Sequence, residues 1–354
     1  MTQFIQLHLL ASYPPANPNR DDSGKPKTAM MGGATRLRIS SQSLKRAWRT
    51  SSVFDSALKE HLGIRTKQMG VEVYNKLRAK GVVEQPALDA AKKIAEVFGK
   101  LKKEDKDTPL KGLEIEQLTH FSPEERKLID SLVEKVSGGE KLGDTDLELL
   151  QKKHTAADIA LFGRMLASSP KFNTEAAAQV AHAITVHKVT VEDDFFTAVD
   201  DLNKGEEDLG AGHMGETEFA AGLFYLYLCI DSRLLLENLS GDVNLAKTTL
   251  AALLEAAATV APSGKQNSFG SRVRASYILA EKGAQQPRSL SVAFLKPVYG
   301  EDLLNASITA LDNTAQNMDK VYGVCRDASQ EMNAVNGEGS LQDLIKFVTD
   351  VYHG

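Results

Sequence analysis

The chain has 354 residues, of which 42 % are hydrophobic and 25 % charged, and a formal net charge of −5. This length and composition are typical of a soluble globular protein with two domains, or with one domain that carries a large insertion. No apolar run reaches the roughly 18 residues of a membrane span, and the first residues lack the pattern of a signal peptide. The only cysteines, Cys229 and Cys325, exclude a disulfide framework and a four-cysteine zinc site, so a cytoplasmic protein is expected.

Strand-like and helical segments alternate along most of the chain. Strands are expected where apolar and polar residues alternate or β-branched and aromatic residues cluster, at residues 4–12, 36–40, 157–162, 184–191, 219–230, 272–279 and 289–295. Helices are expected where apolar residues recur every three or four positions, throughout residues 55–153 and again at 245–260, 303–318 and 341–352. This order predicts an α+β fold of the ferredoxin-like kind, with a helical insertion after the first helix.

A strand, two serines and a basic helix follow one another near the N-terminus. Residues 36–39 alternate like a half-buried strand, and Ser40 or Ser41 can cap a helix that begins near Gln42. A helix start of this kind presents free backbone N–H groups, and the helix dipole favours an anion there. The start of this helix is therefore a candidate anion site.

The expected helix has one basic face and one apolar face. Lys45 and Arg49 lie one turn apart with Arg46 beside them, whereas Leu44 and Trp48 mark a second, apolar face. The stretch contains no acid, although like charges one turn apart destabilise a helix by roughly 0.2–0.5 kcal/mol per pair. A solvated basic face is one explanation, but the strand and the serines in front of the helix favour a phosphate as the external counter-charge.

Charge is distributed unevenly along the chain. Residues 20–49 hold eight basic residues against two acids, a balance of +6, whereas residues 192–218 hold ten acids against one lysine, a balance of −9. Both stretches overlap long segments, 12–33 and 192–217, that are expected to be loops. The basic stretch indicates a contact with nucleic acid that the net charge of the whole chain conceals.

Several short motifs follow one another along the chain in a characteristic order. They are Asn-Arg-Asp-Asp at 19–22, Gly-Gly at 32–33, Arg-Ile-Ser-Ser-Gln-Ser-Leu-Lys-Arg-Ala at 38–47, Gly-Arg-Met at 163–165, Ala-His-Ala-Ile-Thr at 181–185 and Phe-Thr-Ala-Val-Asp-Asp-Leu at 196–202. Taken together they closely resemble the CasC family, the backbone subunits of type I-E CRISPR Cascade complexes in the RAMP superfamily. The resemblance is specific in the first 60 residues and in residues 155–230, and looser elsewhere.

The resemblance implies an RRM-like palm, a helical fingers insertion and a protruding thumb hairpin. The palm is expected at residues 1–54 and 156–354, the fingers at 55–155, and the thumb at 190–218 within the palm. Subunits of this family stack head to tail along a CRISPR RNA (crRNA), leave its bases free to pair with target DNA, and assemble with other Cascade subunits in antiviral defence. The chain is therefore expected to be a non-catalytic RNA-binding scaffold, with no cofactor, no metal and no membrane contact.

The resemblance also assigns roles to individual residues. The basic helix would grip the RNA backbone, and Arg164 would hold a further phosphate. Phe195 or Phe196 would stack on a base, with Met165 as a wedge on the other side of a flipped nucleotide; which of the two phenylalanines faces RNA stays open. The expected RNA-binding residues are Arg20, Lys27, Arg38, Ser40, Ser41, Gln42, Lys45, Arg46, Arg49, Arg164, Met165, Phe195, Phe196, Thr197, Lys265, Gln266, Asn267 and Ser268.

A CRISPR RNA-processing endoribonuclease of the same superfamily is the alternative. His182 or His187 could act as a general base, but their spacing does not stack them on a helix, and no nearby Cys or third His completes a zinc site. The acidic stretch could be proposed as a magnesium nuclease site, although an acid-dense loop is a poor frame for catalysis. The loop at 262–269 lacks the spacing of a phosphate loop, which excludes a nucleotide triphosphatase.

Overall fold

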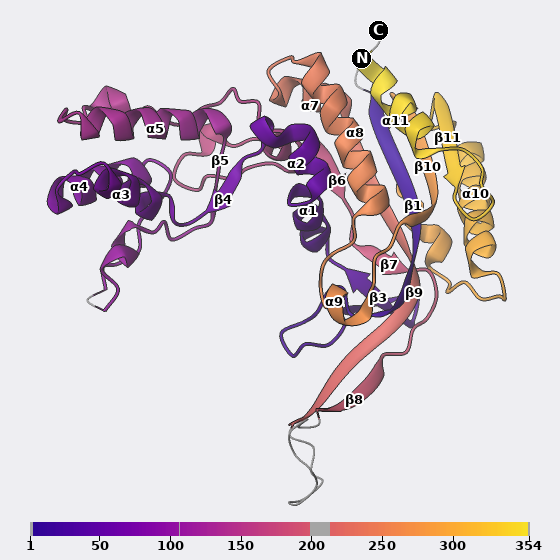
Figure 1. The fold of residues 1–354 in the computed structure, drawn as a ribbon. Coiled ribbons are helices and arrows are strands. Elements are labelled where there is room, and N and C mark those ends of the chain that lie inside the picture. The colour runs from indigo at the N-terminus through magenta and orange to yellow at the C-terminus, as the bar shows by residue number, and fades with distance from the viewer. Residues whose placement is uncertain (1–2, 106, 199–212, 353–354) are drawn as a thin grey trace, which may run out of the picture. The chain divides into compact units, whose positions relative to one another are not determined.

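The computed structural model describes residues 3–105, 107–198 and 213–352, which form two compact units (Figure 1). The first, here called the sheet unit, comprises Met1–Phe54, Gln179–Ile230 and Leu250–Gly354. The second, the helical unit, comprises Asp55–Ala178 and Asp231–Thr249. None of the helices in the described ranges is long and apolar enough to cross a membrane.

A nine-stranded sheet forms the centre of the sheet unit, with the strand order β11-β10-β1-β9-β7-β3-β2 and with β6 and β8 paired to β9. Its strands are β1 (Phe4–Ala16), β2 (Thr28–Met31), β3 (Ala34–Ile39), β6 (Ala178–Val180), β7 (Ala183–Thr185), β8 (Glu192–Ala198), β9 (His213–Asp231), β10 (Ala275–Gly283) and β11 (Ala328–Asn333). Neighbouring pairs such as β1 with β10, β3 with β7 and β7 with β9 are antiparallel. The α+β fold expected from the sequence is therefore confirmed.

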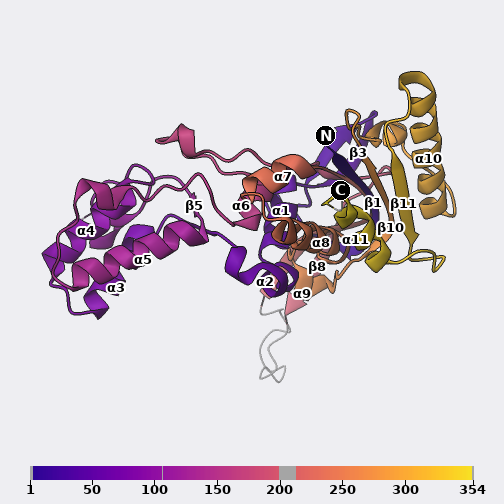
Figure 2. The same cartoon turned by 90° about the horizontal axis from the view of Figure 1, so that it is seen from above.

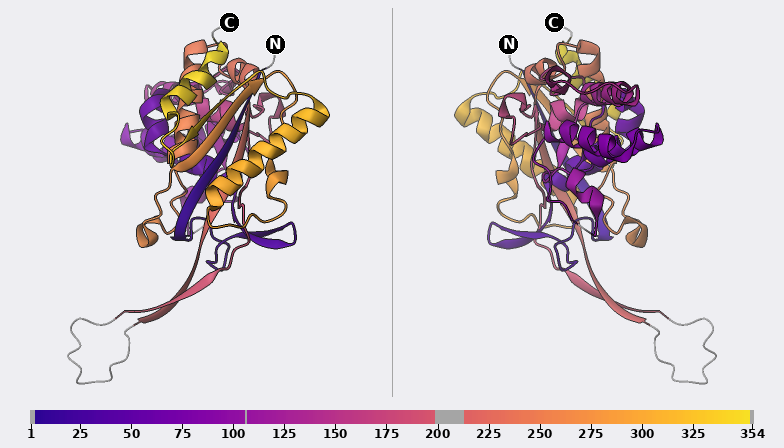
Figure 3. Two further views of the ribbon diagram at one scale, coloured as in Figure 1. Left: turned by 90° about the vertical axis from the view of Figure 1, so that its right-hand side faces the viewer. Right: turned by 90° about the vertical axis from the view of Figure 1, so that its left-hand side faces the viewer.

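Helices cover both faces of this sheet. The long helix α10 (Leu303–Tyr322) lies across one face, where Leu311 and Ala315 join a buried cluster with residues of β1, β9 and β10 (Figure 3). The helix α11 (Leu341–Thr349) lies on the opposite face (Figure 2). The remaining elements of this unit are α1 (Ser41–Arg49), α9 (Gln266–Phe269) and the 3-10 helices η5 (Ser291–Phe294) and η6 (Asp350–Tyr352). Two helices, α2 (Ser52–Leu58) and α8 (Val243–Thr259), pass from one unit into the other.

The helical unit has its own core. Its elements are η1 (Lys59–His61), β4 (Ile64–Thr66), α3 (Met69–Ala79), α4 (Glu84–Glu96), η2 (Pro109–Leu113), β5 (Thr119–Phe121), α5 (Pro123–Ser137), η3 (Asp144–Leu147), α6 (Ala157–Phe162), η4 (Pro170–Phe172) and α7 (Ser232–Asn238). Apolar residues of α3, α4 and α5, such as Val73, Ile94 and Ile129, are fully buried against one another. A capping box between Ser122 and Glu125 fixes the start of α5.

Two expected strands are wrong, and a third, expected at residues 184–191, ends at Thr185 in β7. Residues 157–162 form the helix α6, and residues 291–294 form a 3-10 helix. Both segments are short apolar runs, for which periodicity alone does not separate a strand from a buried helical turn. In α6 the alanines favour the helix, and Gly163 ends it with a φ of +79°, a value that suits glycine.

The expected boundary of the helical insertion at residue 155 also differs from the structure, because residues 156–178 belong to the helical unit. Polar contacts within that unit explain the difference. The buried carboxylate of Asp158 lies 2.8 Å from Nε2 of His120, and Nη1 of Arg164 donates to Glu125 at 2.6 Å. These contacts attach the segment to β5 and α5. Of the expected thumb, residues 199–212 lie outside the described residues.

Candidate nucleic-acid interface

The helix α1 presents its basic residues to the surface and anchors its apolar face in the core. Ser40 is its N-cap, with Oγ accepting from the backbone N–H of Ser43 at 3.3 Å. Leu44 and Trp48 are buried, and Trp48 is fully inaccessible. A buried indole holds the helix firmly, so the opposite face, which carries Lys45, Arg46 and Arg49, is presented in a fixed orientation. Partial burial lowers the pKa of Lys45.

A histidine side chain accepts a hydrogen bond from the backbone at the start of this helix. Nδ1 of His182 accepts from the backbone N–H of Ser41 at 3.1 Å and lies 3.5 Å from Nη1 of Arg38. The pKa of His182 is lowered, chiefly by burial and also by the positive charge of Arg38, so the ring is held neutral with its proton on Nε2. His187 is engaged in the same way, because its Nε2 accepts from the backbone of Leu223 at 3.2 Å.

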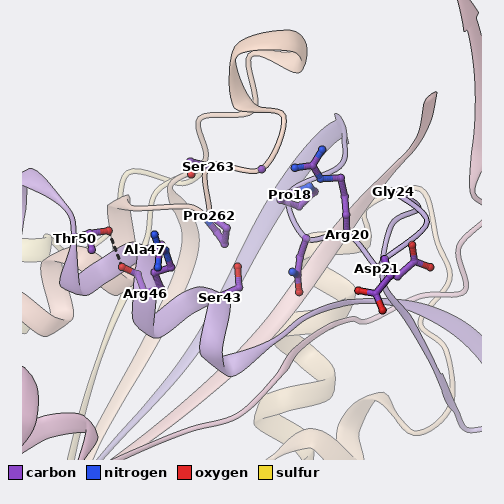
Figure 4. Close-up of a pocket in the computed structure, with 13 residues that line it drawn as sticks. Pro18, Arg20, Asp21, Gly24, Ser43, Arg46, Ala47, Thr50, Pro262 and Ser263 are labelled. Carbon is purple, nitrogen blue, oxygen red and sulfur yellow. Dashed lines mark hydrogen bonds between the residues drawn. The ribbon is translucent and has the colours of Figure 1, made fainter. Parts of the chain in front are cut away.

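A polar cavity of about 460 Å³ opens beside α1, and we call it the arginine cavity (Figure 4). Three segments of the sheet unit line it: the loop after β1, the outer side of α1 and the loop before α9. Two guanidinium groups, those of Arg20 and Arg46, border the cavity. The lining residues are Pro18, Asn19, Arg20, Asp21, Asp22, Gly24, Ser43, Arg46, Ala47, Thr50, Pro262, Ser263 and Gly264.

The loop before α9 reaches the cavity through a close backbone contact. A Cβ at Gly264 would lie 2.3 Å from the carbonyl oxygen of Pro18, so only glycine fits. The next residue, Lys265, has a φ of +47°, and its Nζ donates to Oγ1 of Thr217 on β9 at 3.0 Å. The expected contacts Gln266, Asn267 and Ser268 follow on the short helix α9, at the base of the β8–β9 hairpin.

The loop after β1 is tied to the same region. The backbone N–H of Lys27 donates to Asn19, and that of Arg38 donates to Lys27. The carbonyl oxygen of Asn19's side chain accepts from the N–H of Ser40, which links the loop to the start of α1. The structure therefore gathers the expected residues Arg20, Lys27, Arg38, Ser40, Ser41, Gln42, Lys45, Arg46 and Arg49 on the loop after β1, on β3 and on α1.

One basic residue of this region is not on the surface. Arg36, which contributes to the positive balance of residues 20–49, is fully buried in β3. Its guanidinium donates to the carbonyl oxygens of Thr185 at 3.0 Å and Phe294 at 2.9 Å. Arg36 therefore links β3 to β7 and η5, and the charge that is offered to a ligand is smaller than the sequence count suggests.

The expected thumb is a two-stranded ribbon in which the two phenylalanines face opposite ways. Phe195 pairs with Glu216 and Phe196 pairs with Gly215, and the side chains are 66 % and 44 % exposed. A Cβ at Gly215 would lie 2.4 Å from Cζ of Phe196, so the ring lies against the backbone of β9. Thr197 follows on β8 and pairs with Met214. The base of the ribbon carries an ion pair between Lys25 and Glu218, which raises the pKa of Lys25.

Arg164 is not placed to hold a phosphate. Its guanidinium is buried in the helical unit, where it donates to the carboxylate of Glu125 at 2.6 Å and to the carbonyl oxygens of His120, Gln151 and Phe172. The neighbouring Met165 is 78 % exposed, as a wedge would need to be. Within the described ranges, no group of three or more His, Cys, Asp or Glu side chains is arranged to hold a metal ion.

Comparisons with known proteins decide the family. A family model, Cas_CT1975, described as CT1975-like protein, matches residues 5–346. The chain belongs to this family. It is similar to a solved chain titled "CRISPR RNA-guided surveillance complex, pre-nicking", with 31 % identity, a TM-score of 0.84 and coverage of 99 % of this chain and 100 % of that one. A second chain, titled "CRISPR RNA-guided surveillance complex", has 27 % identity, a TM-score of 0.61 and coverage of 98 % and 99 %. No curated protein sequence matches this chain. The family resemblance seen in the motifs is thereby confirmed.

Proposed function

We propose that this chain is a non-catalytic crRNA-binding backbone subunit of a type I-E CRISPR surveillance complex. The observation that carries the proposal is the convergence of α1, the loop after β1 and the loop before α9 around the arginine cavity, beside a helix face with three basic residues. These groups are guanidinium and ammonium ions and hydroxyls, which bind phosphate and do not read base edges. The similarity to chains of RNA-guided surveillance complexes supports the same conclusion.

The subunit would bind target DNA only through the guide, since the protein would hold the backbone of crRNA and leave the bases to pair. Copies of the chain would stack head to tail, with the β8–β9 ribbon of one copy crossing the RNA held by the next. The negative balance of residues 192–218 and the positive balance of residues 20–49 support such a heterologous contact, which extends into a filament instead of closing. Other subunits of the complex would join the same assembly.

The ribbon favours Phe196 as the residue that stacks on a base. The outer end of its ring lies against the backbone of Gly215, so the ring is held in place while 44 % of the side chain stays exposed. Phe195 lies on the opposite face, directly across from Glu216, where a carboxylate would repel the phosphates that flank a stacked base. Phe196→Ala should therefore weaken RNA binding by about 1–3 kcal/mol. Phe195→Ala is the matched control, and an equal or larger loss there would reverse the assignment.

The salt dependence of RNA binding tests the grip of α1. Each phosphate contact to single-stranded nucleic acid contributes about 0.7 to the slope of log K against log salt. Replacing Lys45, Arg46 and Arg49 together by Ala should therefore reduce this slope by about 2 and weaken binding to all RNA sequences alike. An unchanged slope would remove α1 from the interface. The control variant replaces three exposed lysines that lie outside this region: Lys59, Lys141 and Lys320.

The two histidines that could act as general base in an endoribonuclease are both engaged in hydrogen bonds. His182 and His187 each accept a backbone N–H with one ring nitrogen, so the rings are used to hold the backbone. Purified protein should leave repeat RNA uncut with or without magnesium. Cleavage that is specific and that disappears in His182→Ala would favour the alternative.

A further inference from the structure

We propose that the arginine cavity recognises the ribose of the RNA backbone, and that Asp22 is the residue that distinguishes RNA from DNA. In this arrangement Arg20 and Arg46 hold a phosphate, and the carboxylate of Asp22 accepts a hydrogen bond from the adjacent 2′-hydroxyl. The inference rests on the proposed function, because it assumes that nucleic acid occupies this cavity.

The cavity is lined by positively and negatively charged side chains that, among the described residues, do not pair with each other. Arg20, Arg46, Asp21 and Asp22 all line it, yet within the part of the chain that the structure describes no ion pair joins these guanidinium groups to these carboxylates. A few residues away, Lys25 and Glu218 do form an ion pair. Figure 4 shows the side chains of Arg20 and Asp21 pointing away from each other. A ligand in the cavity can therefore meet donors and acceptors at the same time.

The two aspartates have different roles. Oδ1 of Asp21 accepts from the backbone N–H of Ser23 at 2.9 Å, from the hydroxyl of Ser23 at 2.8 Å and from the N–H of Lys25 at 3.0 Å. These hydrogen bonds, with that from the Ser23 hydroxyl as the largest cause, lower the pKa of Asp21, and they shape the loop. Asp22 is exposed, and none of the interactions among the described residues engages its carboxylate. Asp22 is therefore the acceptor that the loop presents to a ligand.

A carboxylate is unfavourable in a site that only grips phosphate, because the two negative charges repel. It becomes favourable when the ligand places a hydrogen-bond donor beside each phosphate. The ribose 2′-hydroxyl is such a donor, it accompanies every phosphate of RNA whatever the base, and DNA lacks it. An exocyclic amine of a base is also a donor, but it would make binding depend on sequence, which a subunit that holds many different guides cannot use.

The test compares one short oligonucleotide in three forms, with ribose, 2′-deoxyribose or 2′-O-methyl ribose, in binding to the full-length chain. The 2′-O-methyl form keeps the oxygen and loses the donor. The wild type should bind the ribose form at least about tenfold more tightly than either of the other forms, because a hydrogen bond to a charged group contributes at least this much to affinity. Asp22→Ala should abolish this preference and should also raise the affinity for the 2′-deoxy form, because a repulsive charge is removed.

The controls separate this proposal from the proposed function. Glu301→Ala removes an exposed carboxylate outside the cavity and should leave the preference intact. If Asp22→Ala raises or lowers the affinity for all three forms equally, or if the 2′-O-methyl form binds as well as the ribose form, Asp22 does not recognise ribose and only the present inference fails. A preference that changes with base sequence would indicate an amine as the donor and would also overturn it. If the wild type binds none of the three forms, the proposed function fails as well.

Discussion

The buried ion pair of Arg164 and Glu125 should be a major source of stability in the helical unit. The side chains are 1 % and 0 % exposed, and Arg164→Ala would leave the carboxylate of Glu125 without its cation. Removing one partner of a buried pair costs about 3–5 kcal/mol. Because three carbonyl oxygens also lose their donor, we expect the upper part of this range.

Hydrogen exchange measures this loss locally. In Arg164→Ala, the backbone amides of α5 should exchange at least about a hundredfold faster, since 3 kcal/mol exceeds two powers of ten in an opening equilibrium. RNA affinity of the folded variant should stay within about twofold of the wild type. The control is Arg126→Ala, because Nη2 of Arg126 makes only a half-exposed contact of 3.3 Å with Glu72, which contributes about 0–1 kcal/mol. Unchanged exchange in α5 together with a large loss of RNA affinity would refute this account and return Arg164 to the RNA interface.

Three further predictions concern single positions. Burial lowers the pKa of His154 from 6.5 to about 4, so between these pH values the unfolded chain binds a proton that the folded chain does not. The free energy of unfolding of the helical unit should therefore fall by about 3 kcal/mol as pH falls from 6.5 to 4. Urea unfolding measures this loss, which should be absent in His154→Gln. Gly32→Ala should destabilise the sheet unit by more than about 1 kcal/mol, because the new Cβ would lie 1.6 Å from the carbonyl oxygen of Leu295. The control Gly33→Ala places its Cβ in open space and should cost only about 1 kcal/mol, for its φ of +73°. Replacing His182 by Asn should lower thermal stability while leaving RNA uncleaved, because its ring serves the N–H of Ser41.

Local sequence signals predicted the elements that carry the candidate interface. A serine N-cap at 40 or 41, the buried pair Leu44 and Trp48 and the basic residues opposite them follow from the spacing along one helix, and the structure selects Ser40 as the cap. The strands β1, β9 and β10 were expected from their alternation, and the structure extends β9 into the hairpin. Such features depend on residues within a few positions of one another, and a sequence displays these directly.

Features that depend on distant partners were not predictable in this way. The role of Arg164 is decided by Glu125, which lies 39 positions earlier, and an arginine in a motif looks the same whether its guanidinium is buried or exposed. The arginine cavity depends on the approach of Gly264 to Pro18, which only the folded chain reveals. A glycine in a loop permits such a close approach, but the sequence does not name its partner. The individual RNA contacts stay predictions.

The strand β9 runs without interruption from the sheet into the hairpin, over 19 residues. Successive side chains of a strand point to opposite faces, so a single residue inserted between Phe219 and Leu223 would turn the outer part of the ribbon over while leaving the core pairing in place. The faces of Phe195 and Phe196 would then be exchanged. Two inserted residues would restore them, and a β-bulge would absorb one. Related chains should therefore differ in the length of this part of β9 by even numbers of residues, or carry a bulge where the difference is odd.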